Sequence, residues 1–419
     1  MRIVQVHRPK DIRQIMQDIG VTPYGIKVML PKAVACLIKL NSISNITANI
    51  LKQEMLSLGG DVAVSRGALT GKAKKTDCLL MGNLSQFNRL NQKLNRQPFG
   101  LNKLAKDLSH ILKDYQKQGF TLDLGKYKLN LGRRVYIMGI VNLTPDSFSG
   151  DGFYKLRNLR THELTNYIVD YAEQLVKDGA DIIDVGGESS RPGAKPVSVK
   201  EELKRTIPII EALSRKINVP LSVDTYKPEV ARASLESGAV MVNDITGLRN
   251  PKMIKVIARY KAGAVIMHMR GNPRTMQKNP VYVSLIDEII EYLDKAINRA
   301  QFAGIDKEKI IIDPGIGFGK SVEHNLEILN RLQEFKVLGK PVLVGPSRKS
   351  FIGKILNVEP QQRILGASTS LSTNGERSLT TGTVSSCVLA AKSGANIVRV
   401  HDVKEVRQAL SVLERIENI

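Results

Sequence analysis

One unit repeats along the chain from Val135 onward: a short apolar run, a turn rich in Gly, Asp and Ser, and a stretch with helical periodicity. The apolar runs number eight and lie at 135–142, 180–187, 220–224, 240–245, 264–269, 310–315, 341–347 and 396–402. Helical patterns such as 161–179, 284–304 and 403–416 follow several of these runs. Eight strands that alternate with helices predict an α/β fold, a closed (β/α)8 TIM barrel. A doubly wound parallel sheet is the alternative, but it usually has fewer strands, and no GxGxxG follows the first run.

The first 118 residues differ from the rest in charge and pattern. Residues 1–118 contain 19 Lys+Arg and 7 Asp+Glu, so they hold +12 of the formal net charge of +22 that all 419 residues carry. The stretch 119–134 alternates apolar and polar residues around Gly125, which predicts a β-hairpin. We therefore place a domain boundary before this hairpin, between an N-terminal domain at 1–118 and the barrel at 119–419.

The N-terminal domain also shows a mixed α/β pattern. The sequence predicts strands at 2–8, 25–30, 61–67 and 77–82, and amphipathic helices at 46–60 and 101–116. His7 and His110 fall within this pattern and are expected to be structural residues. The domain contains no recognisable set of catalytic residues.

Composition excludes several classes of protein. Hydrophobic residues make up 42% of the chain and charged residues 24%, which is typical of a folded chain rather than a disordered one. No apolar run approaches the roughly 18 residues that a membrane helix needs, and the N-terminus lacks the apolar segment of a secretory signal. Because Cys36, Cys78 and Cys387 form no CxxC pair, we expect a cytoplasmic protein without disulfides. The positive charge leaves nucleic acid, an anionic membrane or an acidic small substrate as partners.

Polar residues are concentrated where the predicted barrel strands end. Such positions form the active sites of TIM barrels. The polar groups after the eight runs are Asn142, Glu188 to Arg191, Asp224, Asn243 with Asp244, His268, Asp313, Ser347 to Ser350, and Arg399 with His401. Two loops rich in small residues, 144–152 and 189–196, follow the first two runs and are typical of mobile active-site loops.

Two sets of side chains at these ends indicate a chemistry. Asp224 and Asp313 are acceptors that need donors if they are buried, and Asn243 offers one donor and one acceptor. With Lys349 they suit a heterocycle that contains a guanidine group, such as a pterin or a guanine.

The second set is cationic. Arg191, Arg399 and His401, with Asn142 nearby and Lys320 as a further candidate, suit a phosphate or diphosphate accompanied by Mg²⁺. We find no serine or cysteine nucleophile and no zinc motif, and Cys387 is expected to lie in the core of a helix.

The motifs at these strand ends resemble those of the dihydropteroate synthase family. They are MGIVNLTPDSFSGDG (138–152), DVGGESSRPGA (184–194), SVDTYKPEVA (222–231), VNDITGL (242–248), IDPGIGFGK (312–320), GPSRKSFIG (345–353) and IVRVHDV (397–403). The resemblance spans roughly 120–419 and leaves the N-terminal domain outside it. It implies a TIM barrel that joins 6-hydroxymethyl-7,8-dihydropterin diphosphate to 4-aminobenzoate, a folate-biosynthesis step and a target of sulfonamides. A homodimer is also expected.

The resemblance also implies roles for individual residues. It assigns the pterin to Asp224, Asn243, Asp313 and Lys349, and the diphosphate to Asn142, Arg399 and His401, with Asn142 as the protein's ligand for Mg²⁺. It places Ser190, Arg191, Pro192, Phe148, Phe318, Lys349 and Ser350 around the 4-aminobenzoate. The catalytic residues on this interpretation are Arg191, Asp313, Lys349, Arg399 and His401.

Four features depart from the commonest family pattern. The acidic residue of the first loop is Asp151 rather than the residue before it, Ser190 replaces a frequent Thr, and Ile316 replaces a frequent Phe. The segment 359–380 is long for the link after the seventh strand. None of these changes removes a candidate catalytic group.

Two other functions were weighed against this one. A pterin-dependent methyltransferase would share the Asp and Asn pocket, but it would need neither SRKS nor RVHD. Nucleic-acid binding by residues 1–118 is disfavoured because they show no helix-turn-helix, zinc-finger or RNP-like motif, and only 5% of the chain is aromatic. A structural or dimer-supporting role is the default expectation for these residues, and a second enzyme of the pathway is the alternative.

Overall fold

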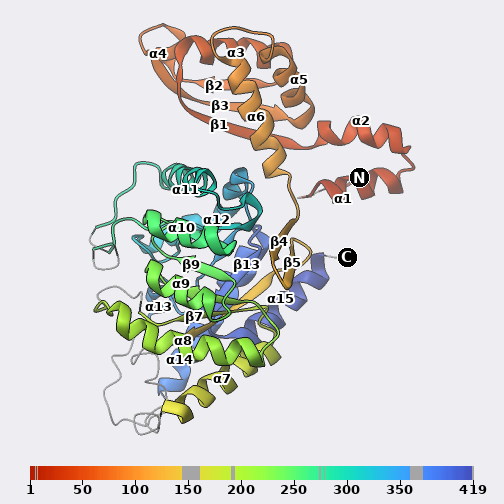
Figure 1. The fold of residues 1–419 in the computed structure, drawn as a ribbon. Coiled ribbons are helices and arrows are strands. Elements are labelled where there is room, and N and C mark those ends of the chain that lie inside the picture. Colours follow the sequence, from red (N-terminus) through yellow and green to blue (C-terminus); the bar gives the residue numbers. More distant parts are fainter. Residues whose placement is uncertain are drawn as a thin grey trace. The chain divides into compact units, whose positions relative to one another are not determined.

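The structure is a computed structural model that describes residues 1–4, 6, 8–143, 161–189, 194–272, 275–277, 279–358 and 371–417, with the side chains of 161–162, 371–374 and 417 excluded. It divides into two compact units, Met1–Lys113 and Asp114–Ile419. Figure 1 labels their helices and strands.

The first unit is built on a three-stranded antiparallel sheet in the order β1-β3-β2. Its elements are α1 (Pro9–Asp18), α2 (Pro23–Ala33), β1 (Ala35–Ser44), α3 (Asn45–Ser57), β2 (Asp61–Val64), α4 (Arg66–Leu69), β3 (Lys75–Asn83), α5 (Leu84–Leu94) and α6 (Leu101–Tyr115). Helices α3, α5 and α6 bury their apolar faces with Val62, Cys78 and Leu80 of the sheet in one core. Asn83 and Gln86 form a capping box that fixes the start of α5 directly after β3.

Two of the predicted N-terminal strands are wrong. Residues 25–30 lie in α2, because Pro23 occupies its first turn and the side chain of Thr22 accepts a hydrogen bond from the Gly25 amide at 3.2 Å. The described residues of 2–8 contain no strand, whereas β1, which the sequence analysis missed, forms one edge of the sheet. The predicted strands at 61–67 and 77–82 and both predicted helices are confirmed within a few residues.

The second unit contains an eight-stranded parallel sheet. Its strands are β6 (Tyr136–Asn142), β7 (Ile182–Gly186), β8 (Leu221–Asp224), β9 (Met241–Asp244), β10 (Gly263–Met267), β11 (Ile310–Asp313), β12 (Leu343–Val344) and β13 (Ile397–Val400). Their order is β11-β10-β9-β8-β7-β6-β13-β12, and a parallel bridge between Ile312 and Val342 joins the two ends. The sheet is therefore a closed barrel, which confirms the predicted (β/α)8 fold and excludes the doubly wound alternative.

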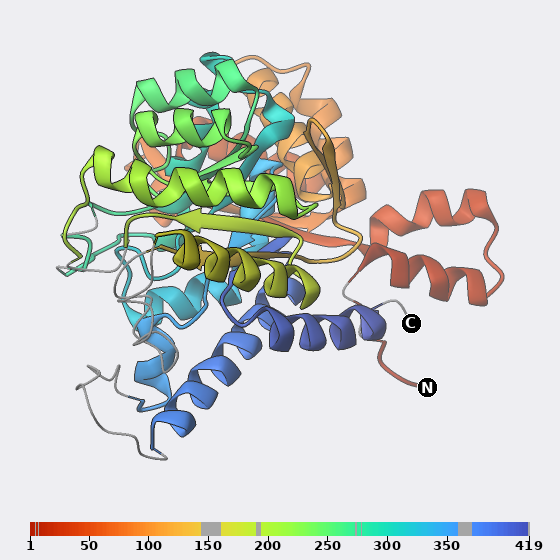
Figure 2. The same ribbon diagram turned by 60° about the horizontal axis from the view of Figure 1, so that its bottom comes forward.

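Helices cover the outside of this barrel (Figures 1 and 2). They are α7 (Thr161–Lys177), α8 (Val199–Lys216), α9 (Pro228–Glu236), α10 (Pro251–Tyr260), α11 (Leu285–Phe302), α12 (Val322–Asn330), α13 (Ser350–Ile355), α14 (Leu371–Lys392) and α15 (Val403–Glu417), with short 3-10 helices η3 (Lys307–Lys309) and η4 (Leu332–Leu338). Outward-facing strand residues such as Ile183, Val223 and Ile266 pack with the helices in one large core. Cys387 is fully buried in α14, as predicted.

The amino-terminal end of the barrel is closed by a β-hairpin. Strands β4 (Phe120–Leu124) and β5 (Tyr127–Leu131) pair antiparallel around Gly125, whose φ of +78° suits a tight turn. Leu122, Leu124, Leu129 and Leu131 of the hairpin share a core with the inward-facing side chains Met138, Ile182, Met241, Val265, Ile311, Leu343 and Ile397. The predicted hairpin is thus confirmed, and it fills the end of the barrel opposite the predicted site.

The inward-facing residues change from apolar to polar along the barrel axis. Two positions after the apolar layer, the same strands present Asp184, Asn243, Asp313 and Arg399 to the interior. Asp184, Asn243 and Asp313 are buried. Because side chains alternate along a strand, this arrangement follows directly from the strand register and places charged groups next to one another at the carboxyl ends.

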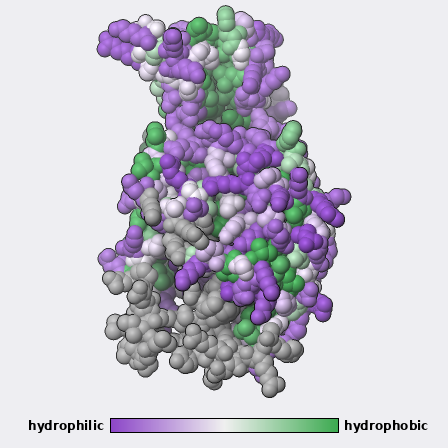
Figure 3. Space-filling view, turned by 60° about the vertical axis from the view of Figure 1, so that its left-hand side comes forward, coloured by the Kyte–Doolittle hydropathy of each residue, from purple (hydrophilic) through white to green (hydrophobic). Residues whose placement is uncertain are grey.

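No described helix is both long and apolar enough to cross a membrane. The face drawn in Figure 3 is mainly hydrophilic, with apolar residues in separate small patches.

Candidate active site at the carboxyl ends of the barrel strands

Three acceptor side chains line the inside of the barrel at its carboxyl end. Asp224 ends β8 and lies beside Asn243 of β9, its register partner. Asp313 ends β11, and its Oδ1 accepts a hydrogen bond of 2.6 Å from the amide of Gly315. Gly315 must lack a side chain, because it has a φ of +74° and a Cβ there would lie 1.9 Å from the carbonyl oxygen of His268. The turn after β11 is thus pressed against the end of β10, which fixes the position of Asp313.

Arg399 connects two carboxylates across the barrel. Its Nε donates to Asp184 Oδ2 at 2.6 Å, and its Nη2 donates to Asp224 Oδ2 at 2.7 Å. Asp184 is a residue that the sequence analysis missed. Its signal in the sequence is a charged residue within the otherwise apolar run 180–187, where a buried strand offers no solvent to a carboxylate.

His401 is held between Asn142 and Ser347. Its Nε2 lies 3.3 Å from Asn142 Nδ2, and its Nδ1 lies 3.0 Å from Ser347 Oγ. With the amide nitrogen of Asn142 facing the ring, Nε2 is the acceptor and Asn142 Oδ1 points away from the histidine. Asn142 is the last residue of β6, Arg399 lies on the adjacent strand β13, and His401 follows the end of β13. The three predicted diphosphate residues therefore lie on or directly after these two strands.

Lys349 lies beside Phe318. Its Nζ is 4.1 Å from the centre of the Phe318 ring, which is a cation–π distance. Lys349 is the N-cap residue of α13, and Ser350 is its first residue and is exposed. Phe318 lies in the turn after Asp313, so the predicted pterin and aminobenzoate residues are joined by one short segment.

Lys320 is not a member of the cationic set at the barrel mouth. It is buried, and its Nζ lies 2.9 Å from His268 Nδ1 and 3.0 Å from the carbonyl oxygen of Phe318. Desolvation lowers the pKa of Lys320 to about 7, although Asp313 acts in the opposite direction. Burial and the nearby Lys320 lower the pKa of His268 to about 2, so His268 is a neutral structural acceptor. The hydrogen bond between Lys320 and His268 therefore holds the Asp313–Lys320 turn against the end of β10.

A second buried network joins Glu188, which follows β7, to residues at the start of α8 and α9. Lys227 donates to Glu188 Oε2, to Glu202 Oε2 and to the Val197 carbonyl oxygen, and Thr225 donates to Glu202 Oε1 at 2.7 Å. Of these groups, only Glu188 was singled out in the sequence, as a polar residue after the second run. The network links Glu188 and Val197 to the start of α9.

Four predicted site residues lie outside the described residues: Phe148, Ser190, Arg191 and Pro192. The same is true of Asp151 and of 359–370, and their assignments stay predictions. The remaining predicted residues are brought together at one end of the barrel.

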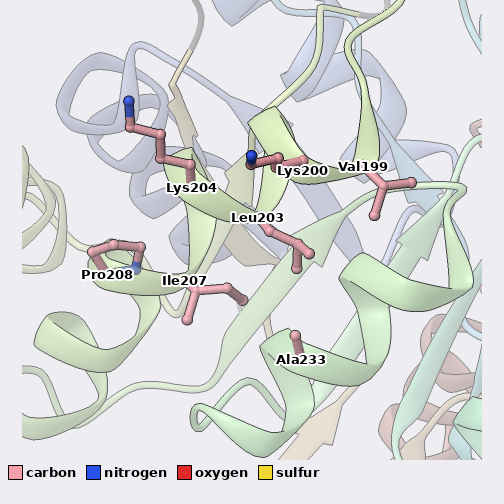
Figure 4. Close-up of a pocket in the computed structure, with 7 residues that line it drawn as sticks. All are labelled: Val199, Lys200, Leu203, Lys204, Ile207, Pro208 and Ala233. Atoms are coloured by element: carbon pink, nitrogen blue, oxygen red, sulfur yellow. The ribbon is translucent and has the colours of Figure 1, made fainter.

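A separate cavity of about 780 Å³ lies on the outer side of the barrel between α8 and α9 (Figure 4). It is lined mainly by apolar side chains, among them Leu203, Ile207 and Ala233, with Lys200 and Lys204 at its edge. It contains no acceptor suited to a heterocycle, so we do not assign it to the reaction.

Burial raises the pKa values of both carboxyl groups at the barrel mouth. For Asp224, desolvation is the main cause and the Arg399 guanidinium acts against it, leaving a pKa of about 7. For Asp313, desolvation is again the main cause, opposed by the Gly315 amide and by Lys349, and the pKa is about 6. Without a ligand, these sites bear a proton near neutral pH more readily than ordinary carboxylates.

These shifts predict that the stability of the ligand-free protein falls as pH rises. In the unfolded chain both groups titrate near pH 4, so between that pH and about 7 the folded protein binds more protons than the unfolded chain. The stabilisation is complete below the unfolded pKa and is lost as pH passes through 6 and 7. We expect the melting temperature to decrease over this window in a thermal-shift series at constant ionic strength. Asp224→Asn, which cannot ionise, should show a shallower decrease, and an equally steep one would contradict this origin.

The fold and the polar barrel mouth define a class of protein. Residues 138–401, which run from the first barrel strand to His401, match the model of the family described as pterin binding enzyme. The acceptors Asp224, Asn243 and Asp313 all lie within this match. The chain is therefore a pterin-binding barrel enzyme.

Similar proteins narrow this class. Dihydropteroate synthase of Synechocystis sp. is 44% identical over 297 residues, which cover 70% of this chain and 94% of that protein. A solved structure of Xanthomonas albilineans dihydropteroate synthase with 4-aminobenzoic acid has a TM-score of 0.62 and 40% sequence identity, and the match covers 72% of this chain and 99% of that chain. The chain belongs to the dihydropteroate synthase family. It is a transferase of folate biosynthesis that condenses 6-hydroxymethyl-7,8-dihydropterin diphosphate with 4-aminobenzoate to give 7,8-dihydropteroate and diphosphate.

A third relative concerns the N-terminal unit. A probable bifunctional folylpolyglutamate synthase/dihydropteroate synthase of Halobacterium salinarum is 39% identical over 407 residues, which cover 96% of this chain and 46% of that protein. The alignment is longer than the barrel unit Asp114–Ile419, so the similarity extends into Met1–Lys113.

Proposed function

We propose that the pterin ring lies among Asp224, Asn243 and Asp313 in the condensation reaction. The observation that carries this placement is the pair of buried carboxylates. Asp313 accepts one hydrogen bond from the described residues, from Gly315, and Asp224 accepts one, from Arg399. The N–H groups of a pterin would supply the missing donors, and their binding would favour the ionised carboxylates.

We place the diphosphate next to Arg399, His401 and Asn142. Arg399 supplies a fixed positive charge, and His401 is held in one orientation by Ser347. Mg²⁺ prefers oxygen ligands and is commonly bound by one protein group together with substrate phosphates. Asn142 Oδ1, which faces away from His401, fits that requirement, and Mg²⁺ bound there would neutralise charge on the leaving diphosphate.

The condensation then needs no covalent enzyme intermediate. The bond between the pterin methylene and the diphosphate oxygen breaks, and the amine nitrogen of 4-aminobenzoate forms a bond to the same carbon and loses a proton. Arg399 stabilises negative charge on the departing diphosphate, while Asp224 and Asp313 stabilise positive charge that develops on the pterin. Arg191 would add a further positive charge beside the diphosphate, as the cationic set in the sequence predicts.

We place the 4-aminobenzoate against Phe318, with Lys349 and Ser350 nearby and with Ser190, Arg191, Pro192 and Phe148 supplied by the two loops. Phe318 is 6% exposed and belongs to a small apolar cluster with Met267 and Met269, so its ring is a fixed wall. Lys349 touches that ring and lies near Asp313, which puts the two substrates side by side.

Phe318→Ala tests this placement. We expect the KM for 4-aminobenzoate to rise roughly threefold to tenfold, the effect of losing one aromatic contact, while the Kd of the pterin measured by calorimetry stays unchanged. Phe302→Ala is the matched control, because Phe302 is 97% exposed on α11. An unchanged KM for 4-aminobenzoate in Phe318→Ala would remove Phe318 from the site.

We further propose that the barrel unit alone carries the catalysis and that Met1–Lys113 has a structural or dimer-supporting role. The Synechocystis enzyme supports this, since 94% of its length is matched by only 70% of this chain. We also infer a homodimer and a cytoplasmic location, where Cys36, Cys78 and Cys387 would stay reduced as the free thiols observed here.

A shortened chain of residues 114–419 should retain the kcat and both KM values of the full-length protein. The physical reason is that the barrel core and the site residues lie entirely within Asp114–Ile419. Steady-state assays of diphosphate release, with light scattering for oligomeric state, would check this. A folded but inactive shortened chain would show that the N-terminal unit takes part in the reaction.

A further inference from the structure

The buried carboxylate of Asp184 has no role in the substrate placement described above. It is the central residue of β7, and its side chain is 0% exposed. Oδ2 accepts two hydrogen bonds, from Arg399 Nε at 2.6 Å and from Asn243 Nδ2 at 3.0 Å. Oδ1 has no hydrogen-bond partner among the described residues. A single oxygen atom thus joins a residue assigned to the diphosphate and a residue assigned to the pterin.

The strand register places Asp184 next to Ser222, two residues before the end of β7. Gly186 of β7 is the register partner of Asp224, and Asp184 is the register partner of Ser222 on β8. Asp184 and Ser222 therefore lie side by side on adjacent strands, each two residues before the pair Gly186 and Asp224. From this position Asp184 can reach the side chains of the site but not the solvent.

The acceptor-only chemistry of a carboxylate determines how Asn243 is oriented. The group of Asn243 that faces Asp184 is its NH₂, which donates to Oδ2 at 3.0 Å. Asn243 Oδ1 then faces away from Asp184. The mouth of the barrel consequently presents three acceptors, two carboxylates and one amide oxygen, and this pattern selects a ring edge rich in N–H groups.

The same oxygen holds Arg399. With its Nε bound to Asp184, the guanidinium directs Nη2 to Asp224 Oδ2 at 2.7 Å. Arg399 is 17% exposed at its side chain, so one edge of the guanidinium remains available to an anion at the mouth.

We propose that Asp184 is a positioning residue of the synthase: it turns the oxygen of Asn243 toward the pterin and holds Arg399 beside Asp224. The proposal rests on the placement of the pterin against Asn243. Asp184 itself touches neither substrate.

Three variants separate positioning from packing. Asp184→Ala removes the acceptor. Asp184→Asn keeps a carbonyl oxygen that can accept from both donors, as Oδ2 alone does now, and removes the charge. Ser222→Ala is the matched control, because Ser222 is equally buried on the adjacent strand and its hydroxyl has no partner among the described residues.

Calorimetry with 6-hydroxymethyl-7,8-dihydropterin gives the decisive measurement. We expect Asp184→Ala to raise the Kd about tenfold or more, the effect of losing one oriented hydrogen bond, whereas Asp184→Asn stays within about threefold and Ser222→Ala within about twofold of wild type. The KM for 4-aminobenzoate should not change in any of the three. If Asp184→Ala does not fold, Asp184→Ser, whose side chain is too short to reach either partner, takes its place.

A double-mutant cycle tests this proposal separately from the pterin placement on which it rests. Asn243→Ala should weaken pterin binding, and adding Asp184→Ala to that variant should weaken it no further. If Asn243→Ala binds the pterin normally, the placement is wrong. If Asn243→Ala weakens pterin binding but Asp184→Ala does not, then Asp184 does not act by orienting Asn243. The same conclusion follows if Asp184→Asn binds the pterin as weakly as Asp184→Ala.

Discussion

Replacing Asp313 with alanine should abolish measurable pterin binding while the barrel remains folded. Asp313 is buried, and its Oδ1 is oriented by the Gly315 amide, so its other oxygen is the natural partner for ring N–H groups. Charge-assisted hydrogen bonds of this kind contribute about 1.5–3 kcal/mol each, so losing a bidentate contact should raise the Kd by about two to four orders of magnitude. Calorimetry of the pterin with the variant measures this directly.

Folding of the Asp313→Ala variant should be near normal or improved. Burial opposes ionisation of the Asp313 carboxyl group. Removing this group therefore removes an energetic cost that the folded state carries at neutral pH. Asp294→Ala on α11 is the matched control for loss of one acidic residue, because Asp294 is remote in the fold and bonds only to Asn298 among the described residues. Wild-type affinity in Asp313→Ala would refute the assignment of the pterin to this side of the barrel.

Replacing Arg399 with methionine should be the most damaging single change to both stability and turnover. It leaves Asp184 and Asp224 buried in the barrel without their shared cation. Removing one partner from a buried ion pair typically costs about 3–5 kcal/mol. The loss of a cation next to the leaving diphosphate should lower kcat by about two to three orders of magnitude. Chemical denaturation and single-turnover measurements would give the two effects separately.

Arg407 provides the matched control for Arg399. It also bonds to a carboxylate and is similarly buried, with Nη2 2.6 Å from Asp181 Oδ2, but Asp181 precedes β7 at the opposite end of the barrel. Arg407→Met should therefore lower stability without changing the rate of the chemical step. If the two variants lost stability and kcat in the same proportion, Arg399 would have only a structural role.

Much of the barrel could be predicted from the sequence because short apolar runs alternate there with stretches of helical periodicity. Each apolar run is long enough for one buried parallel strand, and each ends in a polar residue that no apolar core would accept. One carboxylate at a strand end can simply cap a loop, but Asp224 and Asp313 were found because all eight runs end in polar groups. The hairpin β4–β5 was found from strict alternation around one glycine.

The failures have physical causes as well. Residues 25–30 are apolar and contain Val28, so composition favoured a strand, yet the cap at Thr22 and the proline at the first turn started a helix. Asp184 was missed because it lies within a strand rather than at its end, and only the closed barrel brings Asn243 and Arg399 to it. Lys320 was grouped with the diphosphate cations because a sequence does not show that His268 accepts from it inside the fold.

Because the hairpin β4–β5 fills the lower end of the barrel, we expect substrates to reach the proposed site from the carboxyl ends of the strands. The proposed pterin residues lie at the ends of β8, β9 and β11, whereas Phe318 and Lys349 lie in the segments that follow β11 and β12. On this placement we expect bound 4-aminobenzoate to lie across the path to the pterin residues. We therefore expect the pterin diphosphate to bind first and 4-aminobenzoate second.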